Sequence, residues 1–130
     1  MKRNLIYHTL VPVEQDIEVL AKRNGEHSCR LESISKDGVT LSTDRFTLDK
    51  LLPNHASVAP KQCVELDIDF HLMRGQLPIV AQGRLIAVRR LCRDRYELKL
   101  TFTSLSEQQQ AIIDQFVEDA LHGTQQQKVA

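Results

Sequence analysis

The sequence lacks tryptophan, has only four phenylalanines and two tyrosines in 130 residues, and carries no net charge, with 17 basic and 17 acidic residues. Balanced charge gives no overall field that would direct the chain to nucleic acid or to an anionic membrane surface. Barrels that bind single-stranded nucleic acid need exposed aromatic side chains interleaved with basic ones. So few aromatic residues argue against that class of protein, and any anion-binding site must be local.

Long apolar runs are also missing. No stretch approaches the ~20 apolar residues that a membrane-spanning helix needs. The opening segment, MKRNLIYHTLVPVEQD, is too polar for the hydrophobic region of a signal peptide. We therefore expect a cytoplasmic protein with no membrane insertion, and the length fits one domain.

Motifs for catalysis or metal binding are absent as well. Cys29, Cys63 and Cys92 are widely spaced and form no Cys-x-x-Cys pair, and the five histidines form no spaced ligand pair. Because each cysteine lies within two residues of an aliphatic residue, we expect three buried structural thiols. No nucleophile elbow, Walker loop or dinucleotide fingerprint occurs. The sequence predicts a binding protein rather than an enzyme, without a metal or a cofactor.

What the sequence does contain is alternation of apolar and polar residues, with a period of two. The clearest case is 63–70, which places Val64, Leu66, Ile68 and Phe70 on one face and acids on the other, as in a half-solvated antiparallel strand. Gly83 marks a bulge in another long strand. Few connections are long enough for crossover helices, so the pattern predicts an all-β antiparallel barrel of about six strands. The expected strands are 11–20, 29–34, 39–41, 63–70, 79–91 and 96–102.

One convincing helix comes last, at about 104–122. Ser104 and Glu107 have the spacing of a capping box, and Gly123 supplies a C-terminal stop. An apolar stripe predicts that this helix lies across the sheet; it consists of Ile112, Ile113, Phe116, Val117, Ala120 and Leu121. We expect one domain over 1–123, with the glutamine-rich 124–130 as a flexible tail. Leu51-Leu52-Pro53 allows one short helical turn.

The segment with a chemical signal is the turn at 33–38, Ser-Ile-Ser-Lys-Asp-Gly. The hydroxyls of Ser33 and Ser35 can donate and accept hydrogen bonds. Gly38 permits a close backbone approach that a Cβ would block. This pattern suits a contact to an anion or to the edge of a base. An ordinary hairpin turn with Asp-Gly at its tip is the alternative.

The order of these features resembles the PilZ domain, from about Val11 to Leu121. A strand that contains Gly-Arg-Leu-Ile at 83–86 is followed by a strand from Tyr96 to Phe102, and then by Leu-Ser-Glu at 105–107 opening the helix. The resemblance implies a six-stranded antiparallel β-barrel with one C-terminal α-helix, and recognition of the bacterial second messenger cyclic di-GMP.

PilZ domains that bind this ligand use Arg-x-x-x-Arg in the N-terminal arm and Asp/Asn-x-Ser-x-x-Gly at the end of the second strand. Here Ser35 and Gly38 match, and Ser33 replaces the Asp or Asn. The arm has no Arg-x-x-x-Arg; Arg3 is its one arginine. Guanidinium groups pair with both phosphate and guanine, so their loss weakens the site. The resemblance implies Arg3, Ser33, Ser35 and Gly38 as ligand-binding residues, with Arg30, Arg89 and Arg90 as the cations that can compensate from the sheet.

Two functions follow from the resemblance. One is a cyclic di-GMP receptor with a weakened or non-standard site, which the retained Ser35 and Gly38 favour. The other is a degenerate PilZ adaptor that acts through a protein partner in motility, pilus or surface-attachment control, which the missing arginine pair favours.

Overall fold

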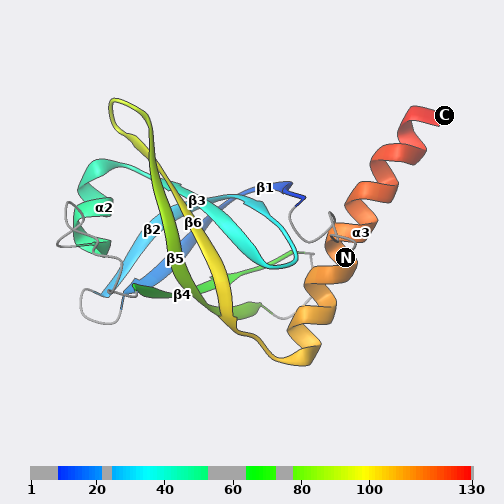
Figure 1. Ribbon diagram of the computed structural model, residues 1–130, viewed down its shortest axis with the longest axis horizontal. Helices are drawn as coiled ribbons and strands as arrows, with labels where there is room; N and C mark the ends of the chain where they lie inside the picture. Colours follow the sequence, from blue (N-terminus) through cyan, green and yellow to red (C-terminus); the bar gives the residue numbers. More distant parts are fainter. Residues whose placement is uncertain (1–8, 22–24, 53–63, 73–77, 130) are drawn as a thin grey trace, which may run out of the picture.

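The computed structural model describes residues 9–21, 25–52, 64–72 and 78–129, with the backbone alone for 123–129. This part of the chain contains six strands and two helices (Figure 1). In chain order they are β1 (Val11–Ala21), β2 (Gly25–Ile34), β3 (Gly38–Thr43), α2 (Arg45–Leu51), β4 (Glu65–Phe70), β5 (Ile79–Cys92), β6 (Arg95–Ser104) and α3 (Glu107–Val129).

The strands close into a barrel in the order β1-β2-β3-β6-β5-β4, and every neighbouring pair is antiparallel. This confirms the predicted all-β fold with a terminal helix. The expected bulge at Gly83 is also confirmed, because the β5–β6 register shifts between Gln82 and Gly83. Several strands extend beyond their predicted ends: β2 begins at Gly25 and β3 continues to Thr43.

The core fills the barrel with the inward side chains of alternating positions, as the period of two predicts. Leu66, Ile68 and Phe70 of β4 are buried, whereas Asp69 between them is exposed. Cys29 is buried as expected, and burial raises the pKa of its thiol to about 11. The same expectation is wrong for Cys92, which is exposed because the β5–β6 hairpin projects beyond the barrel (Figure 1). Cys63 lies outside the described residues.

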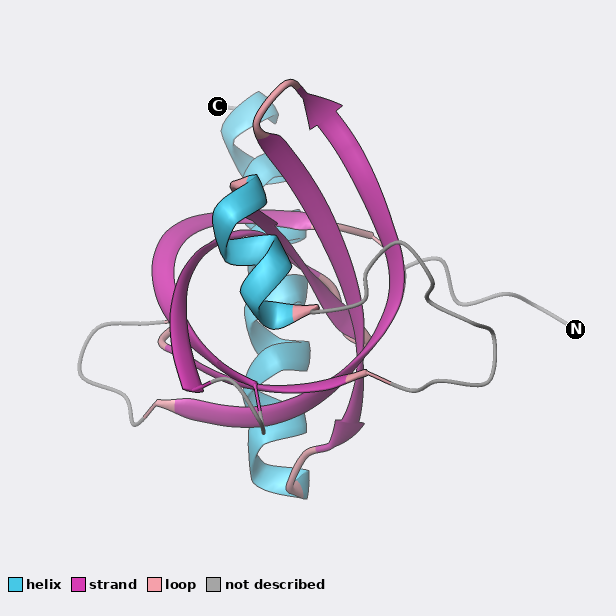
Figure 2. Cartoon of the chain, turned by 90° about the vertical axis from the view of Figure 1, so that its left-hand side faces the viewer, coloured by secondary structure: helices cyan, strands magenta, loops and turns pink. Residues whose placement is uncertain are grey.

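The two helices cover opposite openings of the barrel. Figure 2, which looks down the barrel, shows α2 in front of the opening and α3 crossing behind it. Ile113 and Val117 of α3 are fully buried and belong to the core, so the predicted apolar stripe is confirmed. The helix lies across a barrel end rather than along the sheet, because a closed sheet presents its inner face only at its ends.

The bounds of α3 differ from the prediction at both ends. Its first turn is capped by Ser106, whose hydroxyl accepts a hydrogen bond from the backbone N–H of Gln109, instead of by Ser104. Glycine at position 123 does not end the helix, which continues to Val129. An interior glycine costs only about 1 kcal/mol relative to alanine, and the glutamines that follow are good helix formers. Helix α2 extends upstream of the predicted turn at Leu51 because Asp44 caps it, accepting from the N–H of Thr47.

Candidate functional site

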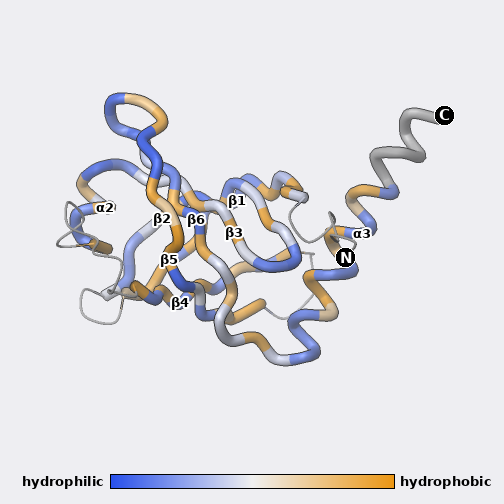
Figure 3. The backbone as a smooth tube through the Cα atoms, viewed as in Figure 1, coloured by the Kyte–Doolittle hydropathy of each residue, from blue (hydrophilic) through white to orange (hydrophobic). Residues whose placement is uncertain are grey.

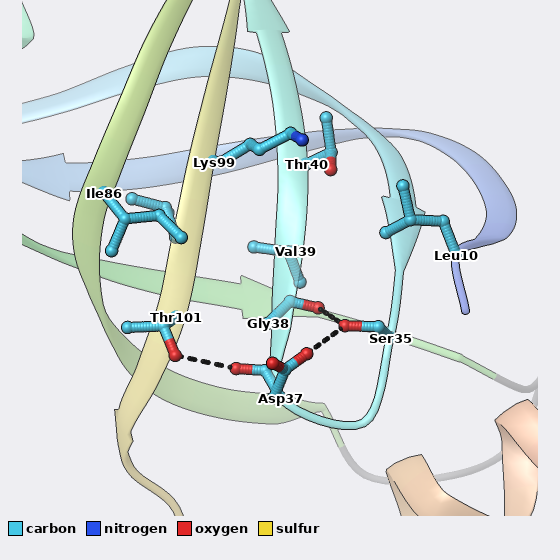
Figure 4. Close-up of a pocket in the computed structure, with 10 residues that line it drawn as sticks. Leu10, Ser35, Asp37, Gly38, Val39, Thr40, Ile86, Lys99 and Thr101 are labelled. Atoms are coloured by element: carbon cyan, nitrogen blue, oxygen red, sulfur yellow. Dashed lines mark hydrogen bonds between the residues drawn. The ribbon is translucent and has the colours of Figure 1, made fainter. Parts of the chain in front are cut away.

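The turn between β2 and β3 is stabilised by its own polar groups. The N–H of Ser35 donates to the carbonyl of Gly38 at 2.9 Å, and the Ser35 hydroxyl donates to a carboxylate oxygen of Asp37 at 2.6 Å (Figure 4). Gly38 packs directly on β6, where a Cβ would collide with the carbonyl oxygen of Leu100. Glycine is therefore required at this position by packing.

Strand β6 and helix α3 hold the same turn from outside. The carbonyl of Asp37 accepts from the N–H of Phe102 at 2.9 Å and from the hydroxyl of Thr101 at 3.1 Å. The carbonyl of Lys36 accepts from the side-chain amide of Gln110 at 2.9 Å. The ammonium of Lys36, whose side chain is 9% exposed, lies 3.3 Å from a carboxylate oxygen of Glu118. The turn is thus fixed by backbone and side-chain contacts on two sides.

Beside the turn, the outer face of the sheet carries a hollow of about 210 Å³, which we call the turn pocket. Its floor is the start of β3, and the exposed side chains of Leu10 and Ile86 lie on opposite sides of it (Figure 4). The volume is below the roughly 300–1,000 Å³ typical of small-molecule sites, so this hollow has room for only part of a ligand of that size. Its lining residues are Leu10, Ser35, Asp37, Gly38, Val39, Thr40, Ile86, Lys99, Leu100 and Thr101.

Lys99 supplies the cation of the turn pocket. It lies on β6 opposite Thr40 of β3, and its side chain extends toward that threonine (Figure 4). The side chain of Lys99 is exposed, and no residue that the structure describes forms an ion pair with it. The one carboxylate of the lining, Asp37, lies at the other end of the pocket and accepts from Ser35. The ammonium of Lys99 is therefore available to an anion.

Farther along β3, a second group of polar side chains compensates its own charges. We call it the Arg30 network: Asp16, Arg30, Glu32, Ser42 and Arg95. Arg30 lies 3.6 Å from Asp16 and 3.1 Å from Glu32. The hydroxyl of Ser42 donates to Glu32 at 2.9 Å and accepts from Arg95 at 2.7 Å.

The Arg30 network borders a larger hollow, of about 360 Å³, than the turn pocket does. The larger volume does not make this hollow the better anion site, because the guanidinium of Arg30 is already paired with the carboxylates of Asp16 and Glu32. The carboxylate of Asp44 at the edge of this hollow caps α2, and the N–H of Thr47 holds its pKa below the ordinary value. A third hollow, of about 320 Å³, is lined by Asp16, Glu18 and Asp69 and repels anions. Of these three hollows, the turn pocket suits an anionic ligand best.

No protein-family model matches the sequence, and no curated protein matches it. Solved structures do match the fold over nearly the whole chain. The complex of K. pneumonia MrkH with c-di-GMP matches 98% of this chain with a TM-score of 0.63 and 14% identity. The Bacillus subtilis inhibitor of motility (MotI/DgrA) matches 95% with a TM-score of 0.62 and 11% identity. This chain spans 56% of the MrkH chain and 53% of the MotI chain.

A third match is the PilZ domain of CeSA from a cellulose-synthesizing bacterium, where 90% of this chain covers 98% of that domain, with a TM-score of 0.51 and 14% identity. The fold is that of a PilZ domain. The fold implied by the sequence resemblance is therefore confirmed. None of the helices among the described residues is long and apolar enough to span a membrane, and those residues contain no group of His, Cys, Asp or Glu placed to hold a metal ion.

In this PilZ-type barrel, the structure brings only part of the predicted site together. Ser35 and Gly38 line the turn pocket. Ser33 is half-buried and lies opposite Thr40, in the cross-strand row that continues to Lys99. Arg30 belongs to the network described above and does not line the turn pocket. Arg3 lies outside the described residues.

The sequence motifs missed Leu10, Thr40, Ile86 and Lys99 as lining residues of the turn pocket. The alternation on β6 places Lys99 and Thr101 on the outer face, and that signal was available. What assigns Lys99 to the pocket is its pairing with Thr40, which depends on the register between β3 and β6.

Proposed function

We propose that this PilZ-type domain is a receptor for cyclic di-GMP, with a non-standard site centred on the turn pocket. The observation that carries the proposal is the pocket itself. The turn that bears Ser35 and Gly38 borders a hollow with exposed apolar sides and one available ammonium group. Cyclic di-GMP offers purine faces for the apolar sides and phosphates for the cation.

The comparisons support this choice of ligand. MrkH with the same fold forms a complex with c-di-GMP, and so does PlzA of Borreliella burgdorferi, which matches 95% of this chain with a TM-score of 0.52. The proposed role is binding without catalysis, in the cytoplasm. Because Ser33 replaces the motif's Asp or Asn and the arm has no Arg-x-x-x-Arg, we propose weaker binding than a complete motif would give. Each missing charge-assisted hydrogen bond accounts for about 1.5–3 kcal/mol.

Isothermal titration calorimetry of the full chain with cyclic di-GMP tests the proposal. We expect saturable binding in the micromolar range or weaker, and a higher thermal unfolding midpoint at saturating ligand. Ser35→Ala combined with Arg3→Ala is expected to weaken binding strongly, and salt to weaken it further. Absence of both heat and thermal shift at ligand concentrations on the order of several hundred micromolar would overturn the receptor function.

A second function, an adaptor for a protein partner, is favoured by the β5–β6 hairpin. The hairpin projects from the barrel (Figure 1), and Figure 3 shows hydrophobic and hydrophilic segments side by side at its tip. Ile86, Val88 and Leu91 are 61%, 40% and 46% exposed. Exposed aliphatic side chains gathered on one element favour protein contact. Pull-down with the wild-type chain and with Val88→Asp separates the two functions, because this substitution lies outside the lining of the turn pocket.

A further inference from the structure

The described part of the proposed site has an unusual source of positive charge. A ligand with two phosphates needs cations, and of the turn pocket's lining residues Lys99 is the one that carries positive charge. This lysine comes from a strand of the barrel, not from the N-terminal arm or from the turn. The inference below rests on the proposed function and concerns how that site binds phosphate.

Cross-strand pairing places Lys99 at the centre of a polar row. Lys99 lies opposite Thr40 on one side and opposite Ala87 on the other, and Thr40 lies opposite Ser33. Directly opposed residues of antiparallel strands project to the same face, with Cβ atoms about 5 Å apart. A lysine in this row has hydroxyl groups on one side and the small side chain of Ala87 on the other, which leaves its ammonium group room above the sheet.

Two other arginines of the sheet already form ion pairs. Arg89, on the neighbouring strand, lies 3.3 Å from Glu97, and Glu97 is the next outward carboxylate on the strand of Lys99. Arg30 is held by Asp16 and Glu32. An ion pair of this kind must be broken before the cation can bind an external phosphate. Lys99 has no ion pair with any described residue, so no such contact has to be broken before its ammonium group binds a phosphate.

We propose that Lys99 binds a phosphate of cyclic di-GMP and so replaces an arginine of the missing arm motif. Thr40 of β3 and Thr101 of β6 line the same pocket, so their strands lie on either side of the bound phosphate. Leu10 and Ile86 contact the faces of a purine from opposite sides. An ammonium group is a point charge, whereas a guanidinium forms bidentate bonds with phosphate or with guanine. Lysine therefore contributes charge to this site and little selection for guanine.

Calorimetry on Lys99→Gln and Lys99→Arg tests this assignment. Loss of one charge-assisted bond is expected to raise Kd about tenfold or more for Lys99→Gln, whereas Lys99→Arg keeps Kd within about threefold because the charge remains. The salt dependence of binding should also be shallower for Lys99→Gln, since one charge contact is lost. Because the side chain is exposed, the thermal unfolding midpoints of both variants should stay near that of the wild type.

Lys50→Gln is the matched control. Lys50 is also exposed, but it lies on α2, where its ammonium is over the ring of Phe46, so its Kd should equal the wild-type value. If the wild type binds and Lys99→Gln binds equally well with an unchanged salt dependence, the assignment of Lys99 is overturned and the receptor function stands. If the wild type does not bind, the receptor function and this inference are both overturned.

Discussion

At its first residue, Gly38, strand β3 borders the turn pocket, and toward its last residue, Thr43, it borders the Arg30 network. In the turn pocket, the geometry is fixed by backbone contacts, and Lys99 has no ion-pair partner among the described residues. In the Arg30 network, side chains fix one another: Arg30 is paired with two carboxylates, and Arg95 donates to the hydroxyl of Ser42. Available charge, and not the number of charged residues or the size of a hollow, therefore marks the better candidate site.

The largest expected effect comes from breaking the backbone packing under the turn pocket. In Gly38→Ala, the added Cβ meets the carbonyl of Leu100 and lies 3.2 Å from the Cα of Thr101. Backbone atoms cannot move aside cheaply, so we expect a loss of about 3 kcal/mol or more in the free energy of unfolding. Urea denaturation measures this loss.

Gly83→Ala is the control for Gly38→Ala. Its Cβ would approach the Cβ of Leu100 at 3.1 Å, a contact that a small shift of the two strands relieves, so the expected loss is about 1 kcal/mol. Equal losses for the two variants would mean that the turn is not fixed by its backbone.

The second effect concerns the contact between α3 and the turn. Glu118→Gln removes the carboxylate 3.3 Å from the ammonium of Lys36 and leaves that cation nearly buried. We expect the free energy of unfolding to fall by about 1–2 kcal/mol, less than for a fully buried pair because the Glu118 side chain is 44% exposed. Chemical denaturation of wild type and variant gives the difference.

Glu97→Gln provides the matched ion-pair control. This substitution leaves Arg89 without its carboxylate partner, but the Arg89 side chain is 68% exposed and stays hydrated. We therefore expect the free energy of unfolding to fall by less than about 0.5 kcal/mol. A loss as large as that of Glu118→Gln would contradict the importance of the buried Lys36 charge.

The third effect is a pH dependence of the free energy of unfolding. It arises near the Arg30 network, where Asp44 caps α2. Hydrogen bonds from the N–H and hydroxyl of Thr47 lower the pKa of Asp44 below its ordinary value of 3.8. The folded pKa is the lower one, so this stabilisation is complete above about pH 4 and disappears as the pH falls through the folded pKa. Asp44→Ala should cost about 1 kcal/mol near neutral pH, and less in acid.

Unfolding of wild type, Asp44→Ala and Asp44→Asn over a range of pH checks this sign. Asparagine is an equally good N-cap without a titrating group, so Asp44→Asn should be less sensitive to acid than the wild type. A cost of Asp44→Ala that stays constant as the pH falls would be inconsistent with a lowered pKa at this residue.

Much of the fold could be predicted from the sequence because alternation reports directly on burial. The pattern at 63–70 identified β4, and the stripe with Ile113 and Val117 identified the core face of α3. Helix α2 was anticipated only as one turn, although Asp44 stands in front of the apolar spacing of Leu48, Leu51 and Leu52. A helix of seven residues has too few turns for its helical period to be recognised between segments with the strand period.

The candidate site was harder to predict, because it depends on which residues lie opposite one another. Ser35 and Gly38 are adjacent in the chain, so a local motif found them. Lys99 is 59 residues from Thr40 and reaches it only through the β3–β6 register. Arg30 shows the converse: a basic residue in a promising strand is occupied by Asp16, a partner that only the β1–β2 pairing reveals.

The smallest expected effect is the sharpest test of the comparison between the two ends of β3. Arg30→Ala removes a guanidinium that the sequence made a candidate for ligand binding, and the structure places this group in ion pairs outside the lining of the turn pocket. We expect Kd for cyclic di-GMP to change less than about twofold. The free energy of unfolding should fall by less than about 1 kcal/mol, because both ion pairs are partly exposed. Calorimetry and denaturation on one preparation measure both quantities. If Arg30→Ala weakens binding as much as Lys99→Gln does, the paired arginine exchanges its carboxylates for phosphate, and the ligand extends from the turn pocket over the Arg30 network.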